Sequence, residues 1–305
     1  MTISSTSDVP ETEIDTTEEA PKTKAGFVVI VGRSNVGKST LMNALVGSKV
    51  AITSPKPQTT RLPIHGILTR DEGQIVFVDT PGMLKGAKDA LSKALTESLK
   101  NALSDVDILM YVADPTRVIG DEEKSMLRMV EQIDKPKIMV INKMDDNNKP
   151  YLDFYRDLSD KFDYTFEVSA KESAHIKPLI DKLFEILPEG EQFYPAYQIT
   201  NMANNVWVSE LIREKLYLRL RQEVPYTVHV EVTAMEEREN NVLYIAATVF
   251  TTEDRYKRMI IGQGGRGIRE IGQSTRKELE SVMGKKIYLD LQVETNPHWM
   301  LRFEI

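Results

Sequence analysis

Short apolar runs alternate with amphipathic stretches over the first two-thirds of the chain. Runs rich in Val and Ile predict strands near residues 27–31, 63–69, 74–78, 107–113, 137–141 and 164–168. Apolar residues at helical spacing predict helices near residues 38–47, 87–103, 121–132, 151–161 and 175–187. Such alternation builds a mostly parallel sheet with helices on both faces, so we expect an α/β domain over residues 25–187.

The pattern changes after residue 187. The stretch "LPEGEQFYPAYQIT" is punctuated by Pro and Gly and predicts a linker over residues 188–203. A helix near 204–222, two β-branched strands, two helices around a Gly-rich loop and the alternating strand "KIYLDLQV" follow. This order predicts a smaller α+β domain over residues 204–305, with its helices on one face of the sheet.

Composition excludes several classes of protein. The chain has 305 residues, 41% hydrophobic and 28% charged, which is typical of a globular protein with a sizeable core and favours two domains. It has no cysteine, which excludes disulfides and thiolate metal sites, and no run approaches the roughly 18 apolar residues of a spanning helix. Residues 1–24 hold six acidic residues and two lysines, so this expected disordered tail supplies −4 of the net charge of −7.

A phosphate-binding motif follows the first predicted strand. Residues Gly32, Arg33, Ser34, Asn35, Val36, Gly37, Lys38 and Ser39 match G-x-x-x-x-G-K-[ST], and Thr40 continues into a helix. The glycines allow backbone N–H groups to surround phosphate oxygens, Lys38 reaches the outer phosphates, and the Ser39 hydroxyl can bind Mg²⁺. A chance match in a Gly-containing loop is the alternative, and the strand before it and helix after it argue against that.

A second motif, "DTPGM", ends the apolar run "IVFV". Asp79 at the carboxyl end of a strand can hold Mg²⁺, often through water, and Gly82 can offer a backbone N–H to the terminal phosphate. Thr80, Pro81 and Met83 complete this group of expected nucleotide contacts. Asp79 could instead merely cap a turn.

Two further motifs predict which base is bound. The strand before "NKMD" delivers Asn142, Lys143, Met144 and Asp145. The Asp145 carboxylate can accept hydrogen bonds from N1–H and N2–H₂ of guanine, a donor pair that adenine lacks. Lys143 can lie along the ring face. Ser169, Ala170 and Lys171 follow another short strand, where a backbone N–H can meet guanine O6. Together the motifs predict a guanine nucleotide.

The second domain carries an RNA-binding signature. "IIGQGG" contains a G-x-x-G loop, typical of a KH domain, which clamps the backbone of about four single-stranded nucleotides. Cations surround it without an intervening acid, and Ile260, Ile261, Ile268 and Ile271 could form an apolar floor for bases. The candidate RNA contacts are Lys257, Arg258, Ile261, Gly262, Gln263, Gly264, Gly265, Arg266 and Arg269. A small α+β domain with a Gly-rich turn is the alternative.

The four nucleotide motifs resemble those of the Ras-like translation-factor group of P-loop GTPases. "AITSPKPQTTR", residues 51–61, resembles the first switch segment of the Era family, bacterial GTPases of small-subunit ribosome assembly. The resemblance implies a P-loop NTPase domain followed by a type II KH domain, and Mg²⁺-dependent hydrolysis of GTP to GDP. It also implies binding to the 3′ end of 16S ribosomal RNA during maturation of the 30S subunit.

The same resemblance suggests catalytic roles. Thr60, preferred over Thr59, would bind Mg²⁺ in the GTP state, and Asn35 could hold K⁺ in the charge-stabilising place of an arginine finger. Lys38, Thr60 and Asn35 are thus the expected catalytic residues. Met83 stands where many such enzymes have a water-orienting Gln. An RNA-binding adaptor with a structural, barely hydrolysing GTP site therefore remains an alternative. Gly264 also departs from the family, which often has Lys there.

A third alternative is a membrane-surface GTPase. Leu211, Ile212, Leu216 and Leu220 form an apolar stripe on the helix near 204–222. Arg213, Lys215, Arg219 and Arg221 lie mainly off this stripe. These cations could meet anionic lipid, although a solvated helix face is the simpler interpretation. We expect a cytoplasmic monomer, with any membrane contact weak and peripheral at the inner membrane.

Overall fold

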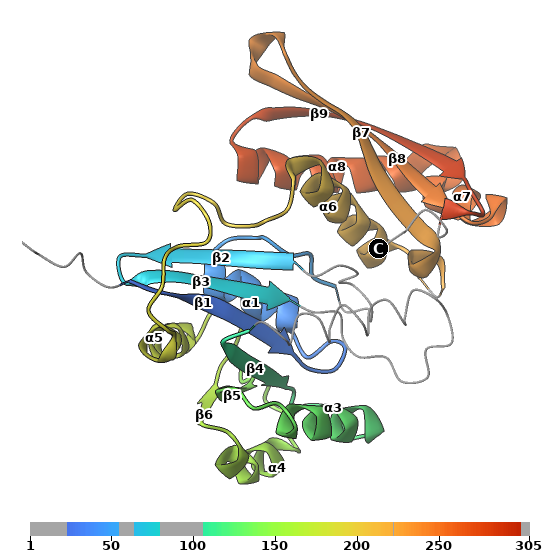
Figure 1. Ribbon diagram of the computed structural model, residues 1–305. Helices are drawn as coiled ribbons and strands as arrows, with labels where there is room; N and C mark the ends of the chain where they lie inside the picture. The colour runs from blue at the N-terminus through green and yellow to red at the C-terminus, as the bar shows by residue number, and fades with distance from the viewer. Residues whose placement is uncertain (1–22, 55–63, 80–105, 222, 300–305) are drawn as a thin grey trace, which may run out of the picture.

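The computed structural model describes residues 23–54, 64–79, 106–221 and 223–299. Two sheets organise them, one in each domain (Figure 1). The first domain, which we call the G domain because its motifs predict a guanine nucleotide, has a sheet of order β2-β3-β1-β4-β5-β6. Its strands are β1 (Lys24–Val31), β2 (Ile64–Arg70), β3 (Gly73–Asp79), β4 (Ile108–Ala113), β5 (Lys137–Ile141) and β6 (Tyr164–Glu167).

The G-domain sheet is parallel except at one edge. Strand β1 pairs in parallel with β3 and β4, and β4, β5 and β6 continue in the same sense. Only β2 runs antiparallel, and it pairs with β3 in a hairpin. Every residue of β3 and β4 is buried, as expected for strands covered on both faces. The mostly parallel α/β fold predicted from the sequence is therefore confirmed.

Helices cover both faces of this sheet and create two apolar cores. Helices α1 (Lys38–Val46) and α5 (Ile176–Ile186) pack into one core, and α3 (Asp121–Glu131) and α4 (Leu152–Asp157) into the other. The helix expected near 151–161 is shorter, because a 3₁₀ turn at Ser159–Lys161 follows it. The helix expected near 87–103 lies outside the described residues.

The second domain shows the predicted element order. It comprises α6 (Asn204–Arg219), β7 (Val228–Arg238), β8 (Val242–Thr251), α7 (Asp254–Ile261), α8 (Arg266–Met283) and β9 (Lys286–Thr295). Strand β8 pairs antiparallel with β7 and in parallel with β9. The predicted leucine and isoleucine stripe of α6 is buried in the core with Ile245 and Val249 of β8. Three short 3₁₀ turns, Val224–Thr227, Glu239–Asn241 and Gln263–Gly265, complete the domain.

The segment between the domains lies against the G domain. The Gln74 side chain accepts hydrogen bonds from the N–H groups of Phe193 and Tyr194, both at 2.9 Å, and donates to the Tyr194 carbonyl at 2.8 Å. Thr200 forms an isolated bridge with Gly66 of β2. Because Gln74 is fully buried, these bonds attach the segment to the sheet.

The expectation of a basic α6 face is wrong for Arg213. This guanidinium is buried, pairs with Glu210 on the preceding turn and lies over the Tyr217 ring at 5.2 Å. Lys215 pairs with Glu214 and Glu278, and Arg219 with Glu270 at 2.6 Å. Intramolecular acids thus engage three of the four cations. Within the described part of the chain, no helix is long and apolar enough to cross a membrane.

Candidate guanine-nucleotide site and RNA-binding loop

The predicted phosphate-binding loop, residues 32–39, lies between β1 and α1, and we call it the cradle. Gly37 has φ +98° and caps the N-terminus of α1. A Cβ atom at Gly37 would lie 2.4 Å from the Asn142 side-chain nitrogen, so glycine is required both by backbone conformation and by space. Asn35 also has a left-handed backbone, with φ +65°. The loop therefore curls tightly before α1 begins, with the helix N-terminus facing it.

Lys38 is held inside this loop. Its Nζ donates to the carbonyl oxygens of Gly32 at 2.9 Å and Arg33 at 3.0 Å. Burial lowers the pKa of the Lys38 ammonium, while nearby carboxylates, Asp79 foremost, act in the opposite direction. The cation is thus fixed at the position where the motif calls for a phosphate contact.

Ser39 and Asp79 meet at the carboxyl ends of two parallel strands. Asp79 ends β3 opposite Ile30 of β1, and the Ser39 hydroxyl donates to Asp79 Oδ2 at 2.6 Å. Hydroxyl and carboxylate oxygens are ligands that Mg²⁺ prefers, so this pair fits a magnesium ion bound together with phosphate oxygens. In the described ranges no cluster of three or more His, Cys, Asp or Glu could hold a metal. The predicted contacts Thr60, Thr80, Pro81, Gly82 and Met83 lie outside the described residues.

Asn142 joins three of the predicted motifs. Its side-chain NH₂ donates to the Val36 carbonyl at 3.0 Å, and its Oδ1 accepts the Ala170 N–H at 3.0 Å. Lys143, with φ +61°, donates from Nζ to the Asn35 carbonyl at 3.0 Å and to Asp114 Oδ2 at 2.5 Å. Because these groups are bonded to one another, the cradle and the base-binding loops form one rigid unit.

Asp145 presents its carboxylate at the edge of this unit. The Ser169 hydroxyl donates to Asp145 Oδ1 at 2.6 Å, and Lys171 Nζ lies 3.8 Å from Oδ2. The Ser169 hydrogen bond holds the pKa of Asp145 below its ordinary value. The carboxylate is therefore charged and oriented, as guanine recognition requires. Met144, by contrast, packs against the core, so its side chain has a structural role.

The Arg33 side chain points away from the cradle. It is buried, pairs with Glu123 of α3 at 2.8 Å and donates to the Val118 carbonyl at 2.7 Å. Glu123 also accepts the hydroxyls of Tyr111 and Tyr155. Burial and the Glu123 charge raise the pKa of Tyr111 well above its ordinary value. Arg33 can therefore contact a nucleotide only through its backbone.

Sequence reasoning missed Asp114 and Glu123. Asp114 follows β4, and the same strand-end signal that identified Asp79 and Asn142 could have found it. Glu123 carries no such signal, because an acid in the first turn of an amphipathic helix is usually solvated. Both are fully buried and position the groups around them.

A cleft of about 780 Å³ opens over this unit. The predicted residues on its wall are Asn35, Gly37, Thr40, Asn142, Lys143, Asp145, Ala170 and Lys171. The structure thus brings the cradle, the "NKMD" motif and the "SAK" motif to one cavity. Two further wall residues, Glu214 and Leu218, belong to α6 of the second domain and were not predicted.

The G-x-x-G loop joins α7 to α8 in the second domain. Gly262, Gly264 and Gly265 all have positive φ, from +59° to +73°. Gln263 and Gly264 are exposed, as are Arg258, Arg266 and Arg269, whereas Lys257 is half-buried. The unpredicted Gly267 allows the helices to approach, since a Cβ there would lie 2.3 Å from the Ile260 carbonyl.

The predicted isoleucine floor is only half correct. Ile260 and Ile271 are 0% and 1% exposed and belong to the domain core, because they share their helix faces with Tyr256 and Thr275. Ile261 and Ile268 are partly exposed beside the loop. Only these two remain available to bases.

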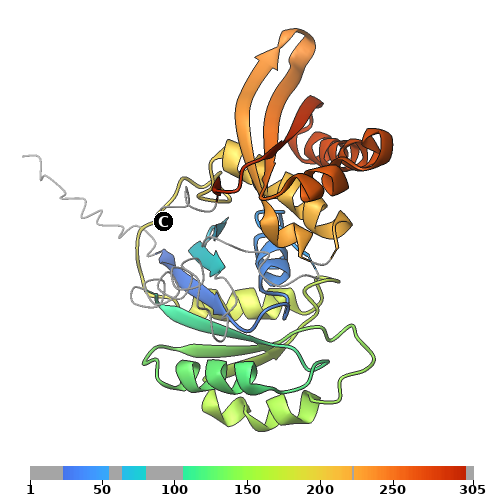
Figure 2. The same cartoon turned by 90° about the vertical axis from the view of Figure 1, so that its right-hand side faces the viewer.

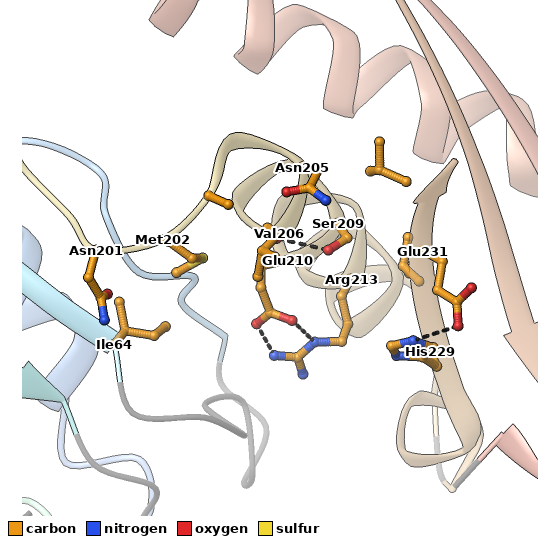
Figure 3. Close-up of a pocket in the computed structure, with 13 residues that line it drawn as sticks. Ile64, Asn201, Met202, Asn205, Val206, Ser209, Glu210, Arg213, His229 and Glu231 are labelled. Carbon is orange, nitrogen blue, oxygen red and sulfur yellow. Dashed lines mark hydrogen bonds and ion pairs between the residues drawn. The ribbon is translucent and has the colours of Figure 1, made fainter. Parts of the chain in front are cut away.

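A second cavity, of about 550 Å³, lies between β2, the interdomain segment, α6 and β7 (Figure 3). Figure 3 shows Glu210 and Arg213 paired with one another on α6, and His229 beside Glu231 on β7. None of the predicted site residues in the described part of the chain lines this cavity. It is thus separate from the nucleotide cleft.

Comparison with known proteins identifies the family. Residues 27–143 match the family described as a 50S ribosome-binding GTPase, and residues 223–300 match a KH domain. The GTPase Era of Halothermothrix orenii is 39% identical over 278 residues, which are 90% of this chain and 94% of that protein. The GTPase Era of Lactobacillus delbrueckii subsp. bulgaricus is 42% identical over 285 residues, 92% of this chain and 94% of that protein. The chain belongs to the GTPase Era family.

Solved Era structures share the fold of both domains. A variant of Aquifex aeolicus Era bound to GDP and AlF₄⁻ is 34% identical, with a TM-score of 0.85. An Era complex with MgGDPNP and nucleotides 1506–1542 of 16S ribosomal RNA is 33% identical, with a TM-score of 0.86. Each match covers 92% of this chain and 97% of the other. The predicted Era fold, a Ras-like G domain followed by a KH domain, is confirmed, and this chain is a GTPase.

Proposed function

We propose that this Era-family GTPase is a switch that binds the 3′ end of 16S ribosomal RNA and assists maturation of the 30S subunit in the cytoplasm. One observation carries the proposal. The cleft that holds the guanine-specific residues is also walled by Glu214 and Leu218 of the KH domain. A change at the nucleotide can therefore reach the RNA-binding domain directly. The Era complex with MgGDPNP and a 16S fragment supports the choice of RNA.

Nucleotide binding would use the bonded unit described above. Asp145 selects guanine, Asn142 keeps its loop against the cradle, and Lys38 neutralises the outer phosphates. Ser39 and Asp79 would hold Mg²⁺, which when bound neutralises the charge on the phosphate oxygens. Thr60, outside the described residues, is proposed as a further hydroxyl ligand.

Asn35 is proposed to hold K⁺ at the same cleft. It lies on the cleft wall, and its carbonyl is fixed by Lys143 at 3.0 Å. Both observations support a role for Asn35 at the nucleotide. Comparison of phosphate release in K⁺ and in Na⁺, with wild type and Asn35→Ala, tests this role. Equal rates of wild type in the two salts would contradict it.

RNA would be held at the exposed loop from Gly262 to Gly265. Glycines permit close approach of the phosphate backbone, and Arg266 and Arg269 extend from the first turn of α8. The segment 200–305 holds 15 basic and 15 acidic residues, so binding depends on these local cations and is salt-sensitive. Because Gly264 supplies no side chain, Arg266 takes the phosphate contact.

We propose that the protein acts as a monomer. A weak, peripheral contact with the inner membrane would need unpaired cations on α6. Three of the four candidates are engaged by Glu210, Glu214, Glu278 and Glu270, and Arg221 alone adds little. The observations therefore favour RNA over lipid as the partner.

The test is binding of a labelled RNA with the 3′-terminal sequence of 16S rRNA. Wild type is compared with a Gly262→Asp, Gly265→Asp double variant, both loaded with GDPNP. We expect tight binding by wild type and loss of binding by the variant, because two carboxylates would repel the RNA phosphates and block their close approach. Guanine nucleotide affinity serves as the folding control and should not change. Equal RNA binding by both proteins would contradict the proposed clamp.

A further inference from the structure

Helix α6 of the KH domain reaches the nucleotide cleft. Seen from the side, the KH domain lies on the G domain with helix α1 beneath it (Figure 2). Glu214 and Leu218, one turn apart on α6, line the cleft with Thr53 and Ser54 of the G domain. Thr53 and Ser54 belong to the segment, residues 51–61, that resembles the first switch. The cleft wall is therefore shared between the two domains.

Glu214 accepts three hydrogen bonds across this boundary. Its Oε1 accepts the Thr53 N–H at 2.9 Å and the Thr53 hydroxyl at 3.2 Å. Its Oε2 accepts Lys49 Nζ at 2.7 Å. Glu214 is only 2% exposed, and a buried carboxylate of this kind is stable only while its donors remain in place. The position of Thr53 is thus fixed by a side chain from the KH domain.

The contacts continue from Glu214 to the helix that begins at the RNA loop. Glu278 of α8 pairs with Lys49 and with Lys215, and Lys215 pairs with Glu214 at 3.1 Å. We call these four residues, Lys49, Glu214, Lys215 and Glu278, the interdomain cluster. Burial acts to raise the pKa of Glu278, but hydrogen bonds from Lys215 and Lys49 outweigh it and hold that pKa low. The cluster contains two cations and two anions and links Thr53 to α8.

The G-domain side of the cluster is tied to the cradle helix. Asn43 of α1 accepts the N–H groups of Val50 and Ala51 at 3.0 and 2.9 Å. The Trp207 indole of α6 donates to the Lys49 carbonyl at 3.2 Å. The segment from Lys49 to Thr53 is consequently bonded to α1 on one side and to α6 on the other. A displacement of Thr53 at the cleft wall must be met by α6 or break these bonds.

We propose that Glu214 is a positioning residue that transmits the state of the nucleotide cleft from Thr53 to α8 and hence to the RNA-binding loop. This inference rests on the proposed function, because it assumes that α8 contacts RNA. The competing interpretation is that the interdomain cluster only holds the two domains together. The two interpretations differ in whether the effect of Glu214 depends on the nucleotide.

Two readouts separate them. Trp207 bonds to Lys49, so its fluorescence reports on the boundary without RNA, and a Trp207→Phe variant assigns the signal. The second readout is the ratio of RNA dissociation constants with GDP and with GDPNP. We expect wild type to show a nucleotide-dependent Trp207 signal and a ratio within the roughly 5- to 150-fold range usual for coupled sites.

Three variants of the full chain complete the design. Glu214→Ala should lose the Trp207 difference and bring the ratio close to one. Glu278→Gln leaves the Thr53 contacts in place, so it should keep the Trp207 difference while lowering the ratio. Glu270→Ala is the matched control, because the ion pair of Glu270 with Arg219 joins the same two helices, α8 and α6, away from the interdomain cluster. It should change neither readout, and thermal unfolding checks that each variant is folded.

The outcomes are distinguishable. A wild-type ratio of one would overturn the GTP-dependent switch of the proposed function. The part of the inference that joins the cleft to α6 would then depend on the Trp207 signal alone. A large wild-type ratio that Glu214→Ala leaves unchanged would overturn the inference and leave the proposed function intact. A Trp207 signal identical with GDP and GDPNP in wild type would also overturn it.

Discussion

In the nucleotide cleft the polar side chains hold one another in place, whereas around the G-x-x-G loop they extend into solvent. Lys38, Asn142 and Lys143 each bond to backbone carbonyls of the cradle. Arg258, Arg266 and Arg269 are exposed and flank a loop of three left-handed glycines. A preorganised site suits one small rigid ligand, and an open cationic loop suits a flexible polymer.

The largest effect is expected from a change of the carboxylate that selects the base. In Asp145→Asn, the acceptor for N1–H and N2–H₂ of guanine becomes partly a donor. We expect the affinity for GDP to fall by a factor on the order of 10⁴, because a side-chain NH₂ would then face the N–H donors of guanine. Titration with labelled GDP measures it. Xanthosine diphosphate, which has an acceptor at position 2, should recover much of the affinity; equal loss for both nucleotides would contradict the assignment.

Removal of the cradle cation should affect hydrolysis next most strongly. In Lys38→Ala, no ammonium remains at the outer phosphates, and we expect phosphate release to slow by about 10² to 10³. Release of phosphate from GTP in single-turnover conditions measures the change. RNA binding without nucleotide should be unaltered, because Lys38 is remote from the KH loop. An unchanged rate would remove Lys38 from the catalytic group.

At the G-x-x-G loop we expect a change in the salt dependence of RNA binding. Arg266→Ala removes one exposed cation from the start of α8. We expect the slope of log RNA affinity against log salt to become shallower by about 0.7, the value for one phosphate contact on a single strand. Arg219→Ala is a control, because this cation on α6 already pairs with Glu270. A slope unchanged in Arg266→Ala would place the RNA elsewhere.

The smallest effect concerns the pH dependence of guanine binding. The Ser169 hydroxyl keeps the pKa of Asp145 low, so the charged form that guanine needs persists until pH falls to that lowered value. In Ser169→Ala the pKa rises toward its ordinary value, and affinity should be lost at a higher pH on acidification. Ser169→Thr, which keeps a hydroxyl, is the control. Superimposable pH profiles for Ser169→Ala and wild type would contradict this role.

The sequence predicted those parts of the molecule whose signals are local. A strand followed by a glycine loop identified Lys38, and strand ends identified Asp79 and Asn142, because the backbone pattern and the chemistry lie within about ten residues. The order of elements in the KH domain was predicted for the same reason, since each strand and helix carries its own periodicity.

The remaining features depend on tertiary contacts. Arg213 was expected on a solvated face, but Tyr217 and Glu210 enclose it. Ile260 and Ile271 were assigned to RNA, but the domain needs them for its core. Glu214 lies 161 residues from its partner Thr53, and no local pattern can indicate such a bond. Long-range polar contacts thus cannot be predicted from periodicity and motifs.

The central claim is that the nucleotide cleft and the RNA loop are one coupled system. The most direct test measures GDPNP and GDP affinities of the full chain with and without saturating 3′-terminal 16S RNA. RNA should tighten GDPNP binding more than GDP binding. Thermodynamic linkage requires that this factor equal the ratio of the RNA dissociation constants with GDP and with GDPNP. The account predicts a common factor well above one. Nucleotide affinities that RNA leaves unchanged would contradict it.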